Sequence, residues 1–345
     1  MSAVANTTHD AAVLVAPGEV RMEHRERPSI APDEVLVRVE AVGICGSDVH
    51  YYREGRIGGY VVEDPLVLGH ESSGVVVAVG SNVKTRRIGE RVAVEPGVSC
   101  GRCEQCRKGR YNLCPDVIFF ATPPVDGALQ KYVAIRADFS FLIPDTMTFE
   151  QAALTEPLAV ALWACRKAGV TVGSKVLVTG SGPIGLLTLQ TALAFGAASV
   201  TITDVDPVKL ELAARFGAAL TIDARALAGL PNRLDVDVHI ECSGNASAAK
   251  DGIGHLDRAG TCVLVGMGGG APLGITVADI QERELSITGT FRYANCYPDA
   301  IQLIASGQVR VEELITARMG LSETESALQH PSLPGALKAI VFPQQ

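Results

Sequence analysis

Residues 175–197, "KVLVTGSGPIGLLTLQTALAFGA", constrain the fold of this chain more than any other segment. An apolar run precedes the turn at 180–185, and an apolar stretch of helical length follows it, which predicts a strand, a tight turn and a helix. The turn matches the pattern G-x-G-x-x-G, and the next apolar run, "SVTITD", ends in the acid Asp204. Glycine-rich turns are common, but strand, helix and acid in this order are typical of a dinucleotide-binding βαβ unit.

The expected contacts of this unit follow from its chemistry. Glycines permit the tight turn, the approach of the backbone to a pyrophosphate and the close packing of helix on strand, while the helix N-terminus offers N–H groups to the phosphates. We expect Asp204 to bind the ribose hydroxyls and to repel a 2′-phosphate, which favours NAD over NADP, and Lys209 to frame the same ribose. A turn without a ligand explains this arrangement less well. The turn residues expected to contact the cofactor are Gly180, Gly182, Pro183, Ile184 and Gly185.

The pattern along the chain predicts two domains. From about residue 150, β-rich runs such as "DVHIEC", "TCVLVG" and "LSITGT" alternate with helical stretches, as in a doubly wound parallel sheet of an α/β protein. Residues 10–95 instead contain short, valine-rich runs bounded by glycine. A chain of 345 residues is also longer than a single hydrophobic core usually supports, so two domains are expected. We predict a β-rich domain of residues 1–157 and 294–345 around an inserted α/β domain of residues 158–293.

Composition excludes several classes of partner. The net charge is −8 and no long run of Lys or Arg occurs, which argues against nucleic acid or an anionic membrane. The start, "MSAVANTTHDAA", lacks the features of a secretory signal and is expected to be an unstructured extension. The apolar runs are too short to span a bilayer. We therefore expect a reducing, cytoplasmic setting.

Four of the nine cysteines form a cluster in "SCGRCEQCRKGRYNLC". In a long chain without a signal, clustered cysteines bind metal more often than they form disulfides. Four thiolates at this spacing match a closed, structural zinc site, and an iron–sulfur cluster is the less favoured use of the same ligands. The predicted ligands are Cys100, Cys103, Cys106 and Cys114. The remaining thiols in apolar segments, expected to be small core residues, are Cys165, Cys242, Cys262 and Cys296.

A second set of metal-binding side chains lies earlier in the chain. Cys45 follows a β-rich run in "VGICGSD", while His70 and Glu71 follow Gly69 in "LGHESSG". A thiolate, an imidazole and a carboxylate are good zinc ligands, and so few ligands leave an open position, as in catalytic sites. Zinc beside a dinucleotide site predicts Lewis-acid activation of an alcohol with hydride transfer to NAD.

These motifs resemble those of the zinc-dependent medium-chain dehydrogenases, from about residue 11 to residue 343. "GHESSG" fits the G-H-E-x-x-G signature of that superfamily. "RIGGYVVEDPLVLGHE", "FFATPPVDG" and "FRYANCYPDAI" resemble more specifically the branch of sorbitol (L-iditol 2-) and other polyol dehydrogenases. Some sorbitol dehydrogenases lack the four-cysteine site, whereas this chain keeps it, so two zinc ions per chain are expected.

The resemblance implies a chaperonin-10-like β-rich catalytic domain, an inserted Rossmann domain and a homotetramer. Cys45, His70 and Glu71 would bind the catalytic zinc, with Glu156 joining directly or through water. Ser47 and His50 would relay the alcohol proton. The substrate would contact Tyr51, Phe119, Thr122, Glu156, Arg292 and Tyr293. The cofactor would also contact Val265, Gly266, Met267 and Phe291.

We therefore expect NAD-dependent oxidation of a secondary hydroxyl of a polyol to a ketose. Sorbitol, xylitol, L-iditol, galactitol and arabinitol remain equal candidates. One alternative is a dehydrogenase of another secondary alcohol, L-threonine or 2,3-butanediol. Another is a non-catalytic metal or nucleotide sensor, against which the complete ligand set and Ser47 argue, because a sensor needs no proton relay.

Overall fold

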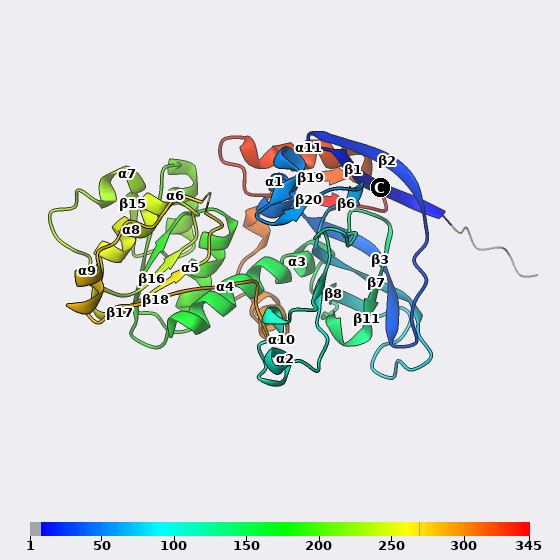
Figure 1. Cartoon of the computed structure of the whole chain (residues 1–345), viewed down its shortest axis with the longest axis horizontal. Coiled ribbons are helices and arrows are strands. Elements are labelled where there is room, and N and C mark those ends of the chain that lie inside the picture. Colours follow the sequence, from blue (N-terminus) through cyan, green and yellow to red (C-terminus); the bar gives the residue numbers. More distant parts are fainter. Residues whose placement is uncertain (1–7, 269) are drawn as a thin grey trace, which may run out of the picture. The chain divides into compact units, whose positions relative to one another are not determined.

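The computed structural model describes residues 8–268 and 270–345. The chain divides into two compact units (Figure 1). The first consists of the chain up to Glu156 with residues 297–305 and 311–345, and the second of residues 157–296 and 306–310. The division therefore runs at residues 156 and 296, with residues 306–310 joining the second unit.

The first unit is built on mainly antiparallel β-sheets, with β19 and β20 pairing in parallel. Its seven-stranded sheet has the order β12-β8-β7-β3-β20-β19, and β11 also pairs with β3. A three-stranded sheet has the order β2-β1-β6. Valines of β3 and β7 pack into the hydrophobic core of this unit. The pairing of β3 with β7 places Gly43 opposite Glu71. The longer strands are β1 (Thr8–Ala16), β2 (Glu19–Glu26), β3 (Glu34–Gly43), β7 (Glu71–Val79), β8 (Arg91–Val94), β11 (Tyr132–Arg136), β12 (Ser140–Leu142), β19 (Ile315–Gly320) and β20 (Lys338–Phe342).

Short elements complete this unit and carry most of its functional side chains. The short strands are β4 (Arg56–Ile57), β5 (Tyr60–Val61), β6 (Leu66–Val67), β9 (Gly97–Val98) and β10 (Ile118–Phe119). The helices are α1 (Gly46–Glu54), α2 (Glu104–Arg107), α3 (Phe149–Ala153), α10 (Tyr297–Ala305) and α11 (Thr324–Gln329). The 3₁₀ turns are η1 (Tyr111–Leu113), η2 (Ala137–Phe139), η3 (Glu312–Leu314), η4 (Leu321–Glu323) and η5 (His330–Ser332). In Figure 1 the red C-terminal α11 lies beside the blue α1, which it contacts.

The second unit is the predicted doubly wound α/β fold. Its six-stranded sheet has the order β15-β14-β13-β16-β17-β18, and all neighbouring strands are parallel. The strands are β13 (Lys175–Thr179), β14 (Ser199–Asp204), β15 (Leu220–Asp223), β16 (Val236–Glu241), β17 (Leu256–Leu264) and β18 (Ser286–Gly289). The helices are α5 (Pro183–Ala194), α6 (Pro207–Arg215), α7 (Ala224–Leu227), α8 (Ala246–Gly254) and α9 (Val277–Gln281). Helix α4 (Thr155–Ala168) starts in the first unit and continues into the second.

One local expectation needs correction. Residues 8–12, expected to belong to an unstructured extension, form the start of β1, and residues 1–7 lie outside the described part of the chain. The segment after Thr148 forms two helices, α3 and α4, and the Thr148 side chain caps α3 by accepting from the N–H of Gln151. Over residues 8–268 and 270–345, none of the helices has the length and hydropathy needed to cross a bilayer.

Candidate functional site

The side chains of Cys45, His70 and Glu71 converge in the first unit. Their ligand atoms all lie within 4.8 Å of one another, as three ligands of one ion require. Cys45 is the N-cap of α1, directly after β3, and Glu71 opens β7, the neighbour of β3 in the sheet. Two adjacent strand ends thus bring Cys45 together with His70 and Glu71, which follow it by 25 and 26 positions.

The carboxylate of Glu71 has the environment of a metal ligand. The side chain is fully buried, its Oε1 binds the ammonium of Lys338, and its Oε2 has no hydrogen-bond partner among the described residues. Gly43 makes room for it, since a Cβ at this position would lie closer than 3.0 Å to Oε2. A buried carboxylate oxygen without a partner is costly unless an ion or donor occupies its open side. The three side chains therefore fit zinc.

Asp48, a residue of α1, lies beside the same three side chains. Its buried carboxylate accepts hydrogen bonds from the backbone N–H groups of Cys45 at 2.9 Å and Gly69 at 3.0 Å. It also lies 3.6 Å from Nδ1 of His70, which leaves Nε2 of that ring available to an ion. Histidines that bind metals are commonly oriented by a carboxylate on the opposite ring nitrogen.

The electrostatic field at the cluster favours positive charge. Burial lowers the pKa of His70, but Asp48 and Cys45 outweigh this effect and hold that pKa well above its usual value. Burial also lowers the pKa of Lys338, and Glu71 and Cys45 again raise it above the ordinary lysine value. The surroundings thus favour the protonated, positively charged forms of His70 and Lys338. An environment that stabilises positive charge also favours the binding of a divalent cation.

Glu156 lies in the first unit with this cluster. It is 5% exposed at the start of α4, and its charge acts on both Lys338 and the buried Glu95. Glu95 accepts a hydrogen bond from the Tyr111 hydroxyl at 2.7 Å. Burial raises the pKa of Glu95 to about 7, against the hydrogen bond from Tyr111 and with a further contribution from Glu156.

The predicted proton relay and substrate residues of this unit lie on α1 and around β10. Ser47 is partly exposed, and the side chain of His50 is 49% exposed with its Nδ1 3.4 Å from Oε1 of Glu54. Tyr51, predicted to line the cleft, is buried in the hydrophobic core. Phe119 lies against the His70 ring at a centroid distance of 5.7 Å, and Thr122 follows three residues later.

The four clustered cysteines also converge. The sulfurs of Cys100, Cys103, Cys106 and Cys114 lie within 4.8 Å of one another. Backbone N–H groups point at three of these sulfurs at 3.4 Å, and such donors stabilise thiolates. The N–H groups of Arg102 and Cys103 lower the pKa of Cys100 to about 7. This geometry fits a closed tetrahedral zinc site.

The glycine-rich turn of the second unit has the geometry of a phosphate-binding loop. Gly180 adopts a φ of 93°, and Gly182 is the N-cap of α5, with Pro183 in its first turn. A Cβ on Gly185 would collide with the carbonyl oxygen of Gly180, so helix and turn pack as closely as the motif predicts. Asp204 ends β14 and accepts the N–H of Ser181 at 2.6 Å, which ties the acid to the turn.

The other predicted cofactor and substrate residues of this unit occupy several positions. Nζ of Lys209 lies 3.9 Å from Asp206. Val265, Gly266 and Met267 follow β17, and Gly266 lines a pocket of about 150 Å³ at the carboxyl ends of β16 and β17. Phe291 is 46% exposed with the Arg292 guanidinium 4.8 Å from its ring centroid, whereas Tyr293 is 3% exposed. The roles given to these residues remain predictions.

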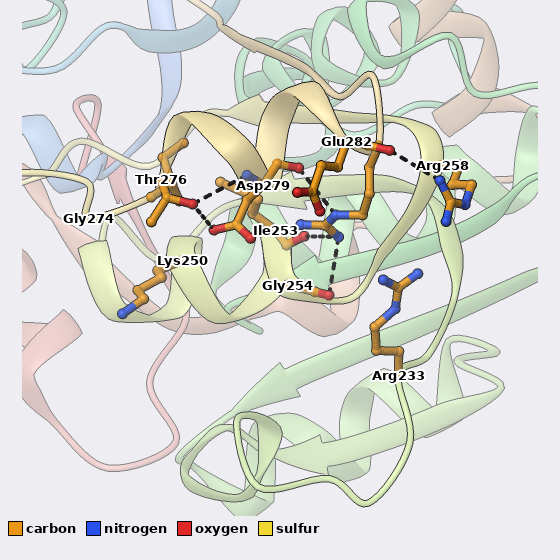
Figure 2. A pocket seen from close by; sticks show the side chains of 11 residues that line it. Arg233, Lys250, Ile253, Gly254, Arg258, Gly274, Thr276, Asp279 and Glu282 are labelled. Carbon is orange, nitrogen blue, oxygen red and sulfur yellow. Dashed lines mark hydrogen bonds between the residues drawn. The ribbon is translucent and has the colours of Figure 1, made fainter.

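The second unit also has a cavity of about 640 Å³, whose lining includes Arg233, Lys250 and Arg258 (Figure 2). The lining is charged, but its three arginines already bind other groups of the protein. Arg233 pairs with Asp235 at 2.8 Å, Arg258 donates to the carbonyl of Glu282 at 3.1 Å, and Arg283 donates to the carbonyl of Leu256 at 2.9 Å. We therefore give this cavity no part in the site.

Three residues that surround the predicted zinc ligands, Asp48, Lys338 and Gly43, were not predicted from the sequence. Asp48 carries a usable signal, because an acid three residues after a helix cap is the capping-box spacing. Lys338 is a lone charge in the apolar strand "ALKAIVF", which also invites a search for a buried partner. Gly43 carries no signal, since only the register of β3 against β7 shows that it faces Glu71.

Comparison with known proteins gives matches over nearly the whole chain. The alcohol dehydrogenase GroES-like domain matches residues 31–145, and the zinc-binding dehydrogenase domain matches residues 183–306. Sorbitol dehydrogenase of Bacillus subtilis (strain 168) is 44% identical over 343 residues, covering 97% of this chain and 97% of that protein.

Solved structures show the same relationship. A zinc-binding dehydrogenase from Sinorhizobium meliloti 1021 bound to NADP has a TM-score of 0.90 and 34% identity, covering 98% of this chain and 100% of that chain. The 2R,3R-butanediol dehydrogenase from Bacillus subtilis has a TM-score of 0.87 and 30% identity, covering 97% of this chain and 99% of that chain.

Proposed function

The chain belongs to the zinc-binding dehydrogenase family and is an oxidoreductase, and we propose that it oxidises a secondary hydroxyl of an open-chain polyol to a ketose with NAD. The observation that carries this proposal is the convergence of Cys45, His70 and Glu71 within 4.8 Å, on a unit that also holds Glu156. This is an open ligand set in a chain 44% identical to a sorbitol dehydrogenase.

The chain's own residues would bind, orient and deprotonate the substrate. When bound, zinc would supply a Lewis acid for the substrate hydroxyl, and NAD would accept the hydride. Oγ of Ser47 would accept the hydroxyl proton while donating its own proton toward the half-exposed His50 ring, which would release a proton to solvent. Asp48 would keep the His70 ring oriented, and Lys338 would fix the Glu71 carboxylate.

Asp204 supports NAD as the cofactor. Its carboxylate stands at the end of β14, where it would meet the ribose hydroxyls and repel a 2′-phosphate. The dehydrogenase from Sinorhizobium meliloti 1021 was solved with NADP, so cofactor choice varies among similar proteins. Steady-state kinetics with both cofactors test this point: Asp204→Ala should lose the preference for NAD, and equal efficiency in the unaltered enzyme would refute it.

Two of the predicted substrate residues, Glu156 and Arg292, suit a polyol. Each can form hydrogen bonds with hydroxyls other than the reacting one, and a short monoalcohol has no such hydroxyls. Sites built around such groups reject analogues without hydroxyls more strongly than apolar pockets reject bulk. Arg292→Ala should therefore reduce polyol turnover much more than any turnover of ethanol.

The decisive experiment measures NADH formation with a substrate panel. The panel contains sorbitol, xylitol, L-iditol, galactitol, arabinitol, L-threonine, 2,3-butanediol and ethanol. We expect kcat/KM for at least one polyol to exceed that for every other class by about tenfold or more. Cys45→Ser should abolish this activity with the fold retained. Greater efficiency with L-threonine or butanediol would reject the polyol assignment, and no turnover of any alcohol would favour a sensor.

A further inference from the structure

The two residues predicted to move the substrate proton depend on α1 for their position. Among the described residues, the Ser47 hydroxyl makes no hydrogen bond to the protein, and the ion-pair partner of His50 is Glu54 on the same helix. Neither side chain is therefore tied to another element by such a bond. The contacts that hold α1 therefore determine the positions of Ser47 and His50 relative to the predicted metal ligands.

The far side of α1 is held by Tyr52. This side chain is 6% exposed, and its hydroxyl donates to Oε1 of Glu325 at 2.7 Å and accepts from Nε2 of Gln329 at 2.9 Å. Both partners belong to α11, more than 270 residues later in the chain. Burial raises the pKa of Tyr52, and the Glu325 charge adds to it against the bond from Gln329, so the phenol keeps the proton that it donates.

The same C-terminal segment also holds the start of α1. Lys338 on β20 donates to the carbonyl of Ile44 at 2.9 Å, next to the ligand Cys45, and binds Glu71. Helix α11 packs on β19 and β20. One C-terminal layer thus fixes the chain just before Cys45 through Lys338, and the end of α1 through Tyr52.

We propose that Tyr52 is a positioning residue for proton transfer, because its hydroxyl fixes α1, and with it Ser47 and His50, against α11. This inference rests on the proposed function of Ser47 and His50. Removal of the hydroxyl leaves the ring in the core and exposes Glu325 and Gln329 to water, which can satisfy them because neither is buried. The effect should therefore fall on the placement of α1 more than on folding.

The test compares Tyr52→Phe with Tyr132→Phe, which removes a hydroxyl from β11 in the same unit. A misplacement of about 1 Å can cost about 10²-fold in rate. We expect Tyr52→Phe to lower kcat about tenfold and to raise the solvent deuterium isotope effect. Zinc content and the KM for NAD should stay unchanged, and Tyr132→Phe should match the unaltered enzyme in all four quantities.

Variants of the partner separate positioning from general stability. Glu325→Gln keeps an acceptor and should restore most of the activity that Glu325→Ala loses, and Tyr52→Phe combined with Glu325→Ala should lose no more than either alone. A lower thermal midpoint of Tyr52→Phe with unchanged kcat and isotope effect would overturn the proposal.

Hydrogen exchange of the 46–54 amides provides a readout that needs no substrate. Exchange should accelerate in Tyr52→Phe and not in Tyr132→Phe, and equal exchange in both would also overturn the proposal. An unaltered enzyme that oxidises no alcohol would refute the proposed function instead, while the exchange result would still decide whether Tyr52 holds α1.

Discussion

Gly43→Ala should disable the predicted zinc site without changing the identity of any of its ligands. Gly43 lies opposite Glu71 in the β3–β7 ladder, and the added Cβ would stand closer than 3.0 Å to Oε2 and 3.3 Å from Cδ of that side chain. Non-bonded heavy atoms prefer about 3.5–4.0 Å, so the carboxylate must retreat by roughly 1 Å or more. Glu71 is fully buried and bound to Lys338, which leaves it little space to move.

The required shift exceeds the tolerance of a metal site. Ligand distances in such sites hold within about 0.2 Å, and a displacement near 1 Å costs about 10²-fold in rate. Overpacking itself costs about 1–3 kcal/mol, so most of the protein should still fold. We expect a loss of zinc equivalent to one ion per chain and a fall of about 100-fold in kcat/KM.

Metal analysis and initial rates on the purified variant check this expectation, with circular dichroism to confirm folding. Gly59→Ala is the matched control, because a Cβ at Gly59 meets nothing within 4 Å. Gly43→Ala with full zinc content and unchanged kcat/KM would show that Glu71 does not bind the catalytic ion in the arrangement described above.

Two further predictions concern other parts of the chain. Cys103→Ser should remove one zinc ion per chain and lower the thermal midpoint by more than about 5 °C, whereas Glu104→Gln on the same loop should do neither. Burial lowers the pKa of His239 to about 3, so the folded protein keeps this ring neutral while the unfolded chain takes up a proton near pH 6.5. The contribution of neutral His239 to the free energy of unfolding is therefore complete above about pH 6.5 and is lost as the pH falls. The loss amounts to about 2 kcal/mol between pH 7 and pH 5. Urea unfolding at both pH values should show this loss reduced in His239→Gln, and equal losses in both proteins would refute the assignment.

The features that sequence alone predicts well are those encoded by neighbouring residues. Gly180 to Gly185, the preceding strand and Asp204 lie within 30 residues, and their order specifies both the parallel sheet and the phosphate-binding turn. The four-cysteine loop is predicted for the same reason, since its spacing alone brings the sulfurs to one point. By contrast, β15 and β19 escaped the analysis, because their short runs give too weak a period-2 signal.

Sequence can indicate that Asp48 and Lys338 are unusual, but not which residues they contact, because those pairings join distant segments. Lys338 is separated from Glu71 by 267 residues, and its place in an apolar strand does not identify its partner. Only when β20 joins the sheet beside β3 does the ammonium reach both Glu71 and the carbonyl of Ile44. Buried ion pairs add little net stability, because desolvation offsets their attraction. The pair is better explained by geometry: it holds Oε1 so that Oε2 of a ligand carboxylate stays open. The residue types and motifs of the predicted ligands are thus visible in the sequence, whereas the contact that holds the Glu71 carboxylate comes from the C-terminal strand β20.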